Sequence, residues 1–495
     1  MTTTTDPLLS LLAINDGYPT ARWNFADAVG TPVASPGGIG NAVTVTYSFL
    51  TEVPSYYASL GLTIDNFTAF SETQQAVTRE VLGKLSAVTN ITFQEVSGVG
   101  TLTYGLNTQT DSGGYAYYPS FAYSYYPSTG LIASATPRNY SGDVWIALDN
   151  TGYYPGGNVY RTLIHETEHA LGIKHPFSGA YTLEASLDNR AITVMSYTNP
   201  PNSYFQDVTS NGAGGYNFNY YNVTPESPMV YDIAALQYLY GANTSYHTGD
   251  DLYTFDTEHP FYQSIWDAGG NDTISLSNFS KGSIIDLRDG YYSKVTIESD
   301  PLPPGYTSSA TPTYNGTNNL GIAYNAIIEN AIGGSGNDTL MGNAVNNALT
   351  GGVGNDTLQG GLGNDALDGG DGSDIAVFSG SKSEYLVAYN GSGFTVSDSV
   401  LGNGDEGTDT LNGIEIFRFA DGDFSSQDFV NHAPVGIPGP LLDGQEDSPY
   451  LLTTAALIAG ITDADGDLMA VLNLTANHGT LSDNGNFTWT FTPDA

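Results

Sequence analysis

Apolar and polar positions follow regular spacings in the first half of the chain. Apolar residues at alternate positions over 43–49 predict a half-buried strand. Ser71 and Gln74 form a capping-box pair ahead of apolar positions that share one helical face, so a helix is predicted from there to Asn90. A second strand is predicted to begin at Ile91.

Two further helices are predicted, one over about 158–171 and one over 228–240, where Gly241 stops it. The Tyr- and Ser-rich stretch 111–140 is predicted to form loops around short strands such as 114–119. Helices and strands thus alternate here, which indicates a mixed α and β domain.

The second half contains an internal repeat of nine residues. Five consecutive nonapeptides start at residues 333, 342, 351, 360 and 369, and a partial copy, GGNDTISL, starts at Gly269. The full copies follow G-G-x-G-x-D-x-U-x, which is typical of parallel β-helix repeats that bind Ca²⁺. A flexible Gly-rich linker would not keep apolar residues at a strict nine-residue spacing. These inward-pointing positions are Leu340, Leu349, Leu358, Leu367 and Ala376.

Composition adds a strong charge asymmetry. The 495 residues include 52 acidic and only 12 basic side chains, a formal net charge of −40. Nucleic acids and anionic membranes both need clustered positive charge, so they are excluded as partners, and cations are favoured. Without cysteine there are no disulfides, thiolate zinc sites or Cys nucleophiles. The start has no Sec-type basic region, and no segment is apolar for long enough to predict membrane insertion.

The segment HETEHALGIKH carries the clearest chemistry. His165 and His169 are four apart, so on a helix both imidazoles lie on one face and can share a metal ion. Glu166 is placed to hold the attacking water. Gly172 can end the helix in a left-handed conformation, and the chain can then return to bring His175 in as a third ligand. Three neutral nitrogens leave zinc an open position, as a hydrolytic centre requires, although a solvated helix or an inactive zinc site is the alternative.

These features resemble the serralysins, secreted bacterial zinc proteases of the metzincin type with hemolysin-type (RTX) calcium-binding repeats. The resemblance rests on four segments: HETEHALGIKHP at 165–176, VMSY at 194–197, SPMVYDIAALQYLYGAN at 227–243 and WDAGGNDT at 266–273. The tail after residue 446 resembles one incomplete cadherin-like or adhesin-type module. Its DADGD segment is interpreted either as a calcium site or as a solvated turn.

The resemblance implies one catalytic zinc ion and a set of roles around it. His165, His169 and His175 bind zinc, Glu166 acts as general base and acid, and Tyr197 is a movable fifth ligand that also stabilises the oxyanion. Met195 forms the floor under the metal, and Gly172 is structural. A substrate strand is implied near Gly114, Tyr115, Ala116 and Tyr117, where an ordinary aromatic strand is the alternative interpretation.

Several structural calcium ions are also expected, because the repeats offer hard oxygen ligands. The resemblance implies sites at the junction with the protease, from Asp267, Gly269, Gly270, Asp272 and Glu329. The repeat pattern predicts ligands from Gly334, Gly336, Asp338, Gly352, Gly354, Asp356, Gly361, Gly363, Asp365 and Asp374. Asn347 takes the Asp position of the second repeat, so we expect one site there to be weak or absent.

The predicted fold is an α+β metzincin catalytic domain, with a twisted mixed sheet plus an active-site helix, followed by an all-β parallel β-roll and further β segments. The predicted boundaries are a candidate propeptide (1–20), the zinc metalloprotease domain (21–245), the RTX β-roll (246–378), a β-rich extension (379–430), a linker (431–440) and the incomplete cadherin-like module (441–495).

The expected function is that of a secreted zinc endopeptidase that hydrolyses extracellular proteins and is stabilised by calcium. The alternative is a calcium-dependent adhesin or surface-layer associated protein with a processing or vestigial protease domain. Expected partners are protein or peptide substrates and a candidate proteinaceous inhibitor. Neither nucleic-acid binding nor membrane insertion is expected, and the protein is expected to be a monomer. Relatives use a type I secretion system without a Sec signal peptide, and the same route is expected here.

Overall fold

A computed structural model gives the fold and describes residues 2–15, 18–32, 35, 37–308, 310–400, 404–441, 443–445 and 448–494. The chain divides into two compact units, of which the first comprises residues 1–386 and 395–424 and the second residues 387–394 and 425–495. No helix among the described residues is both long and apolar enough to cross a membrane.

A five-stranded mixed sheet forms the centre of the N-terminal half. Its order is β5–β4–β6–β10–β7, and only β7, at one edge, runs antiparallel to its neighbour. The strands are β4 (Val43–Phe49), β5 (Ile91–Glu95), β6 (Leu102–Asn107), β7 (Gly114–Ala116) and β10 (Asp143–Ala147). The predicted strands at 43–49 and from Ile91 are therefore confirmed, as is the mixed character of the sheet.

The three predicted helices are also confirmed. They are α3 (Glu72–Val88), α4 (Asn158–Ala170) and α5 (Val230–Tyr240). The start of α3 is fixed as its sequence indicates, because Gln74 Oε1 accepts from the Ser71 backbone N–H at 2.8 Å and Ser71 Oγ accepts from the Gln74 N–H at 3.4 Å. Helix α5 ends at Gly241. Helix α4 is buried along most of its length and holds the candidate site.

The beginning of the chain packs into the same unit. Strand β1 (Thr2–Thr4) pairs in parallel with β11 (Tyr181–Leu183), and helix α1 (Pro7–Leu11) ends with Leu11 fully buried. Residues 2–12 of the candidate propeptide thus contribute to the packed structure, whereas Met1, Asp16 and Gly17 lie outside the described residues.

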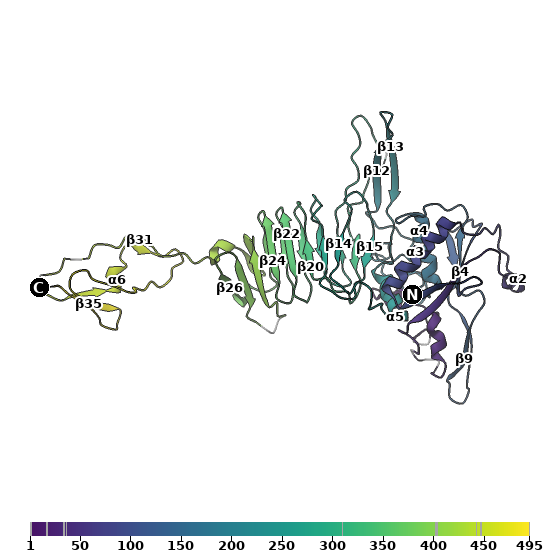
Figure 1. Ribbon diagram of the computed structural model, residues 1–495, viewed down its shortest axis with the longest axis horizontal. Coiled ribbons are helices and arrows are strands. Elements are labelled where there is room, and N and C mark those ends of the chain that lie inside the picture. Colours follow the sequence, from purple (N-terminus) through teal and green to yellow (C-terminus); the bar gives the residue numbers. More distant parts are fainter. Residues whose placement is uncertain are drawn as a thin grey trace. The chain divides into compact units, whose positions relative to one another are not determined.

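The repeats form a roll of two parallel sheets (Figure 1). One contains β16 (Thr273–Ser275), β20 (Asn330–Ile332), β22 (Ala348–Val353), β24 (Ala366–Asp371) and β28 (Thr408–Asn412) as neighbours. The other contains β17 (Ile284–Asp286), β21 (Thr339–Met341), β23 (Thr357–Gln359), β25 (Ile375–Val377) and β29 (Ile416–Phe419). Each turn of the roll therefore takes two nonapeptides.

Side-chain register in the roll agrees with the repeat. Leu340 pairs with Leu358, and Leu349 with Leu367, so partners lie 18 residues apart. All five positions predicted to point inward are buried. The sheets continue beyond the last nonapeptide, since β28 pairs with β24 and β29 with β25. Much of the predicted β-rich extension thus adds further strands to the roll.

A long hairpin leaves the first unit between α4 and α5. Strands β12 (Tyr204–Ser210) and β13 (Tyr216–Asn222) pair over seven positions and project as a pair in Figure 1. The base of this hairpin lines a cleft that also holds Arg190.

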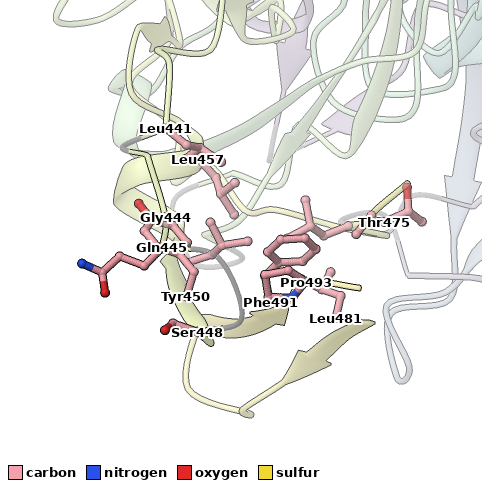
Figure 2. Close-up of a pocket in the computed structure, with 13 residues that line it drawn as sticks. Leu441, Gly444, Gln445, Ser448, Tyr450, Leu457, Thr475, Leu481, Phe491 and Pro493 are labelled. Atoms are coloured by element: carbon pink, nitrogen blue, oxygen red, sulfur yellow. The ribbon is translucent and has the colours of Figure 1, made fainter. Parts of the chain in front are cut away.

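The second unit contains a small antiparallel sheet in the order β32–β35–β34, from β32 (Tyr450–Thr453), β34 (Thr480–Asp483) and β35 (Thr488–Thr492). Its side chains surround a cavity of about 490 Å³, lined by Leu457, Leu481 and Phe491 among others (Figure 2). The lining is mainly apolar and contains no histidine. Leu442, Glu446, Asp447 and Ala495 of the predicted module lie outside the described residues.

Candidate metal centre

Helix α4 brings three polar side chains of the motif together. His165, Glu166 and His169 are only 3%, 5% and 6% exposed. The apolar residues between and before them pack into the core, so the helix cannot rotate these side chains into solvent without exposing that surface. A solvated surface helix, the simpler alternative, does not describe this arrangement.

Gly172 allows the chain to reverse after α4. Its φ is +105°, and a Cβ there would lie 1.9 Å from the carbonyl oxygen of Ala21. Only glycine accommodates both the backbone angle and the close approach. The reversal returns His175 to the two helical histidines, where its ring stacks on Phe177 at a centroid distance of 4.9 Å.

The three imidazoles converge through their Nε2 atoms. His175 Nε2 lies 3.2 Å from His165 Nε2 and 3.0 Å from His169 Nε2. The other ring nitrogens of the helical pair face backbone carbonyls, since His165 Nδ1 is 3.0 Å from Val194 O and His169 Nδ1 is 2.7 Å from Ile173 O. Protons on Nδ1 satisfy those carbonyls and leave the converging Nε2 atoms as lone pairs.

This donor set fits zinc. Tetrahedral zinc with Zn–N bonds of 2.0–2.1 Å would separate its nitrogen ligands by about 3.3 Å, close to the spacing seen. Burial is the main reason why the pKa of all three histidines is lowered. The pKa of His169 falls to about 3. Near neutral pH the imidazoles are therefore uncharged, which is the form that binds a metal.

Met195 is fully buried in the turn that carries Val194. Asp232 on α5 holds this turn, because its carboxylate accepts from the backbone N–H groups of Val194 at 2.7 Å and Met229 at 2.9 Å, and from the Thr193 hydroxyl. Since Val194 O faces His165, Asp232 positions a histidine through the backbone of the Met195 turn.

Glu166 lies beside the histidines without a tight partner. Its Oε2 is buried and has no hydrogen-bond partner among the described residues. Burial raises the pKa of Glu166 to about 8, while the charge of Arg161 acts in the opposite direction. Gly114 gives this side chain room, because a Cβ there would lie 2.8 Å from Glu166 Cγ.

Two tyrosines complete the surroundings. The ring of Tyr197 lies 4.7 Å from that of His175 and 5.7 Å from that of His165, and its side chain is 60% exposed. Tyr118 lies against His169 at 5.2 Å. Partial burial, and then the charge of Glu166, raises the pKa of both tyrosines, so their hydroxyls remain protonated donors near neutral pH.

Strand β7 forms an edge of the sheet next to α4. Tyr117 N donates to Asp143 O at 3.0 Å and Ala147 N donates to Gly113 O at 2.9 Å, so the odd-numbered residues direct their backbone groups toward β10. By alternation, Gly114 and Ala116 direct theirs toward the open edge. Tyr115 and Tyr117 contact each other edge to face.

The acidic side chains of the repeats form two rows along the roll. In one row, each carboxylate accepts a hydrogen bond from the backbone N–H of the residue one turn earlier. Asp356 accepts from Asp338 N at 2.7 Å, and Asp374 accepts from Asp356 N at 2.7 Å. In the other, Asp365 accepts from Asn347 N at 2.8 Å. The repeat glycines stack in the same way, so that a Cβ on Gly354 (φ +137°) would lie 2.4 Å from Gly336 O. Other repeat glycines also lie against the backbone of an adjacent segment. A Cβ would meet Phe279 O at Gly334, Gly334 O at Gly352, Asn343 O at Gly361 and Val345 O at Gly363.

Carboxylate oxygens in these rows remain without partners. The second oxygens of Asp356, Asp365 and Asp374 are buried and make no hydrogen bond among the described residues. Asn347 differs, because its amide donates to Glu329 O at 2.9 Å and its oxygen accepts from Asn343 N at 2.8 Å. Free hard oxygens suit Ca²⁺, whereas the Asn347 position is already satisfied.

At the junction, Asp267, Asp272 and Glu329 approach one another. Glu329 accepts from Asp272 N at 2.7 Å, and Asp267 accepts from Gly269 N at 2.9 Å. Burial and the two neighbouring carboxylates raise the pKa of Asp272 to about 6. His247, Asp251 and Asp267 also place possible ligand atoms within 4.8 Å of one another, and Gly270 packs against Gly249 O.

Comparison with known proteins agrees with this arrangement. A family model of the peptidase M10 serralysin C-terminal domain matches residues 231–298 and 314–428. The chain is serralysin-like. It is 34% identical over 329 residues to the metalloprotease AprA of Pseudomonas entomophila, 32% over 330 residues to a serralysin of Proteus mirabilis, and 34% over 321 residues to serralysin A of Dickeya chrysanthemi. These matches cover 60–61% of this chain and 59–60% of each relative.

The C-terminal end of the chain is similar to a different family of domains. Residues 430–495 match a cadherin-like domain model, which confirms the second resemblance. The serralysin-like part and the cadherin-like part therefore follow one another in a single chain.

Four residues near the centre were not predicted from the sequence. Tyr118 belongs to the predicted strand at 114–119, but nothing in the pattern places it against His169. Asp232 and Arg190 reach the site only through tertiary packing, whereas Arg161 lies on α4 itself, four residues before His165. The one sequence signal for Asp232 is an acidic residue near the start of an otherwise apolar helix.

Proposed function

We propose that this protein is a zinc-dependent endopeptidase, which agrees with the metalloproteases among its relatives. The single observation that carries the proposal is the convergence of three uncharged Nε2 atoms beside a buried, unpaired Glu166. Three nitrogen ligands leave a coordination position open, as in catalytic rather than structural zinc sites.

When bound by His165, His169 and His175, zinc supplies Lewis acidity for water activation and carbonyl polarisation. Glu166 takes the proton of the attacking water and later gives it to the leaving amine. Its position supports both steps, because the side chain is buried beside the histidines and its Oε2 has no hydrogen-bond partner among the described residues. The Tyr197 hydroxyl, exposed beside the histidines, donates to the oxyanion that develops at the scissile carbonyl.

The open edge of β7 offers the backbone of Gly114 and Ala116 to an extended peptide. A peptide paired there would extend the sheet in front of α4 and bring its carbonyl toward Glu166. Because an edge strand does not select for chain ends, this geometry favours endopeptidase cleavage.

We also propose that calcium binds the repeats and the junction, and that the folded protein works outside the cell. The unpaired carboxylate oxygens of the two acidic rows support calcium binding. Extracellular calcium can neutralise those rows, whereas a calcium-poor cytosol would leave the charges uncompensated.

Casein hydrolysis tests the enzymatic proposal, with the Glu166→Ala variant as the decisive comparison. We expect the variant to be at least about 100-fold slower, since it loses the proton-transfer group. Glu184→Ala, which removes an exposed acid of the same unit, serves as the matched control and should keep wild-type activity. Equal activity of wild type and Glu166→Ala would refute the role of Glu166.

A calcium-dependent adhesin or surface-layer associated protein is the second candidate. The cadherin-like match over residues 430–495 favours it. It predicts calcium-dependent attachment to a surface and no proteolysis, so the absence of casein hydrolysis by zinc-loaded wild type would support this candidate.

A further inference from the structure

Two arginines near the metal centre lack acidic partners. Three other arginines form ion pairs, Arg79 with Glu95 at 2.7 Å, Arg288 with Asp286 at 2.6 Å and Arg418 with Asp423 at 2.8 Å. Arg161 and Arg190 form no ion pair among the described residues, although acidic side chains outnumber basic ones 52 to 12 in the chain. The charge of Arg161 acts on Glu166 without an ion pair between them, so both guanidinium groups can still bind a carboxylate from outside the chain.

Arg161 lies on α4, four residues before His165 and on the same helical face. Its Nη2 donates to Asn158 Oδ1 at 2.8 Å and to Thr162 Oγ1 at 3.4 Å, both neutral acceptors. Its Nε is buried and has no partner among the described residues. The guanidinium is thus largely desolvated but is not neutralised.

Arg190 is held next to Tyr197. Its backbone N–H donates to Thr198 O at 3.0 Å and its Nε donates to Ser196 O at 3.2 Å, so the two contacts bracket the tyrosine. Nη1 donates to the side chain of Asn199. Asn158, which accepts from Arg161 Nη2, lines the same cleft as Arg190, so both guanidinium groups lie at the start of α4. Burial and then the charge of Arg190 lower the pKa of Arg161 to about 10, which agrees with this placement.

Arg190 lines a cleft of about 760 Å³ whose other walls come from the base of the β12–β13 hairpin and from the loop before α4. Neutral amides from Asn158, Asn199 and Asn222 surround it. One acid, Glu226, lies on the wall, but its oxygens are engaged by His259 Nε2 at 2.6 Å and by Gln263 Nε2 at 2.8 Å. The uncommitted charge of the cleft is therefore positive.

We propose that Arg161 and Arg190 form a subsite that receives an acidic side chain, Asp or Glu, of the peptide substrate. Guanidinium groups recognise carboxylates with paired hydrogen bonds, and this pair supplies local positive charge on a protein of net charge −40. The inference rests on the proposed endopeptidase function, and it adds a preference that the zinc ligands alone do not provide.

The position of the acidic residue follows from the helix. Four residues of α-helix span about 6 Å, and neighbouring residues of an extended peptide are about 3.4 Å apart. Arg161 therefore lies within about two residues of a scissile bond held at His165. Arg190, beside Tyr197, faces the same short segment of substrate.

The test uses the zinc- and calcium-loaded full chain and a peptide library in which each position within two residues of the cleaved bond carries Glu or Gln. We expect wild type to prefer Glu at one position by about 10-fold or more in kcat/KM, as a direct charge-assisted contact requires. The Arg161→Gln/Arg190→Gln double variant should cleave the Glu and Gln peptides equally. Arg418→Gln, far along the chain and outside the cleft, is the matched control and should keep the preference.

The outcomes separate this inference from the proposed function. If wild type cleaves no peptide, the proposed function fails. If it cleaves without preference for an acidic residue, or if the double variant keeps the preference, the arginine subsite is wrong. Should the double variant not fold, the wild-type preference for Glu must still fall toward unity as NaCl is raised, and a salt-independent ratio would overturn the proposal.

Discussion

A buried acid that the metal centre does not use lies one residue before its second histidine. Glu168 is fully buried, and neither of its carboxylate oxygens has a hydrogen-bond partner among the described residues. Burial, and then the carboxylate of Asp232, raises its pKa well above the ordinary value. A carboxyl group without partners in the core destabilises the fold, so Glu168 is a site where stability can be gained.

Replacement of Glu168 by Met removes the unpaired oxygens and keeps the volume similar. We expect the free energy of unfolding to rise by about 1–3 kcal/mol, which is the usual cost of an unsatisfied buried polar group. Chemical unfolding of the zinc-loaded protein measures it. The exposed Glu184→Met control should change stability by no more than about 0.5 kcal/mol. A clear loss of stability in Glu168→Met would show that the carboxyl group has a partner that stabilises the fold.

Asp143 gives the N-terminal half a pH-dependent stability. Its carboxylate is buried and accepts from the hydroxyls of Tyr56, Tyr57 and Thr103, and burial raises its pKa from the ordinary 3.8 to about 6. The folded protein therefore holds this proton more tightly than the unfolded chain. The sign follows directly: the contribution of Asp143 to stability is present below about pH 4 and is lost as the pH rises to about 6.

The Asp143→Asn variant isolates this effect. A shift from 3.8 to about 6 corresponds to at most about 3 kcal/mol. Unfolding of both proteins across pH 3.5–7 should show wild type losing stability relative to the variant by up to that amount as the pH rises. Parallel curves for the two proteins would contradict the raised pKa.

At the scale of secondary-structure elements, the end of α4 determines whether the third histidine reaches the other two. The helix stops after Ala170, and Gly172 turns the chain back in a backbone conformation that other residues rarely adopt. The length of the helix and the turn after it thus set the geometry of the ligand set as much as the histidines themselves.

The Gly172→Ala substitution tests that dependence. Because its Cβ would collide with Ala21 O, we expect zinc affinity to fall at least 10-fold, as measured by competition with a chromophoric chelator. Gly83→Ala within α3 is the matched control, since its Cβ meets nothing within 4 Å, and it should keep zinc affinity and add about 0.5–1 kcal/mol of stability. Unchanged zinc affinity in Gly172→Ala would contradict the role of the turn.

Local patterns predicted the elements well where one segment contains all the information. The capping pair Ser71 and Gln74, the alternation at 43–49 and the nine-residue period each specify an element without reference to distant residues. Asp232 and Arg190 could not be predicted in the same way, because their contacts join segments about 40 residues apart or depend on a cleft formed by several loops. The continuation of the roll into β28 and β29 was missed because backbone pairing persists there without the glycine signature.

At the scale of the whole molecule, the acidic excess is concentrated where parallel strands stack carboxylates in rows. Asp356 and Asp365 each have a pKa raised to about 6, with burial as the largest cause, so their ionisation near neutral pH opposes folding. Calcium would remove that opposition and supply the charge balance that the twelve basic residues cannot. Because the chain has no cysteine, no disulfide can stabilise the fold in its place.

Calcium removal should therefore unfold the roll before the N-terminal half. We expect the full chain in EGTA to lose much of its β-sheet circular dichroism and to regain it on addition of millimolar Ca²⁺, with Mg²⁺ less effective because it demands a tighter octahedral geometry. An Asp356→Asn/Asp374→Asn variant should need more calcium for the same signal. A β signal that does not respond to calcium would exclude the calcium-dependent folding of the repeats.

Zinc titration of the metal-free protein tests the central claim most directly. The protein is stripped with a chelator in the presence of Ca²⁺, and casein hydrolysis is followed as Zn²⁺ is added back at known free concentration. We predict that activity is absent without zinc and saturates at one equivalent per chain, and that Glu166→Ala binds the same single equivalent but stays inactive. Full activity in the zinc-free protein, or a Glu166→Ala variant restored by zinc, would contradict a zinc endopeptidase built on His165, His169, His175 and Glu166.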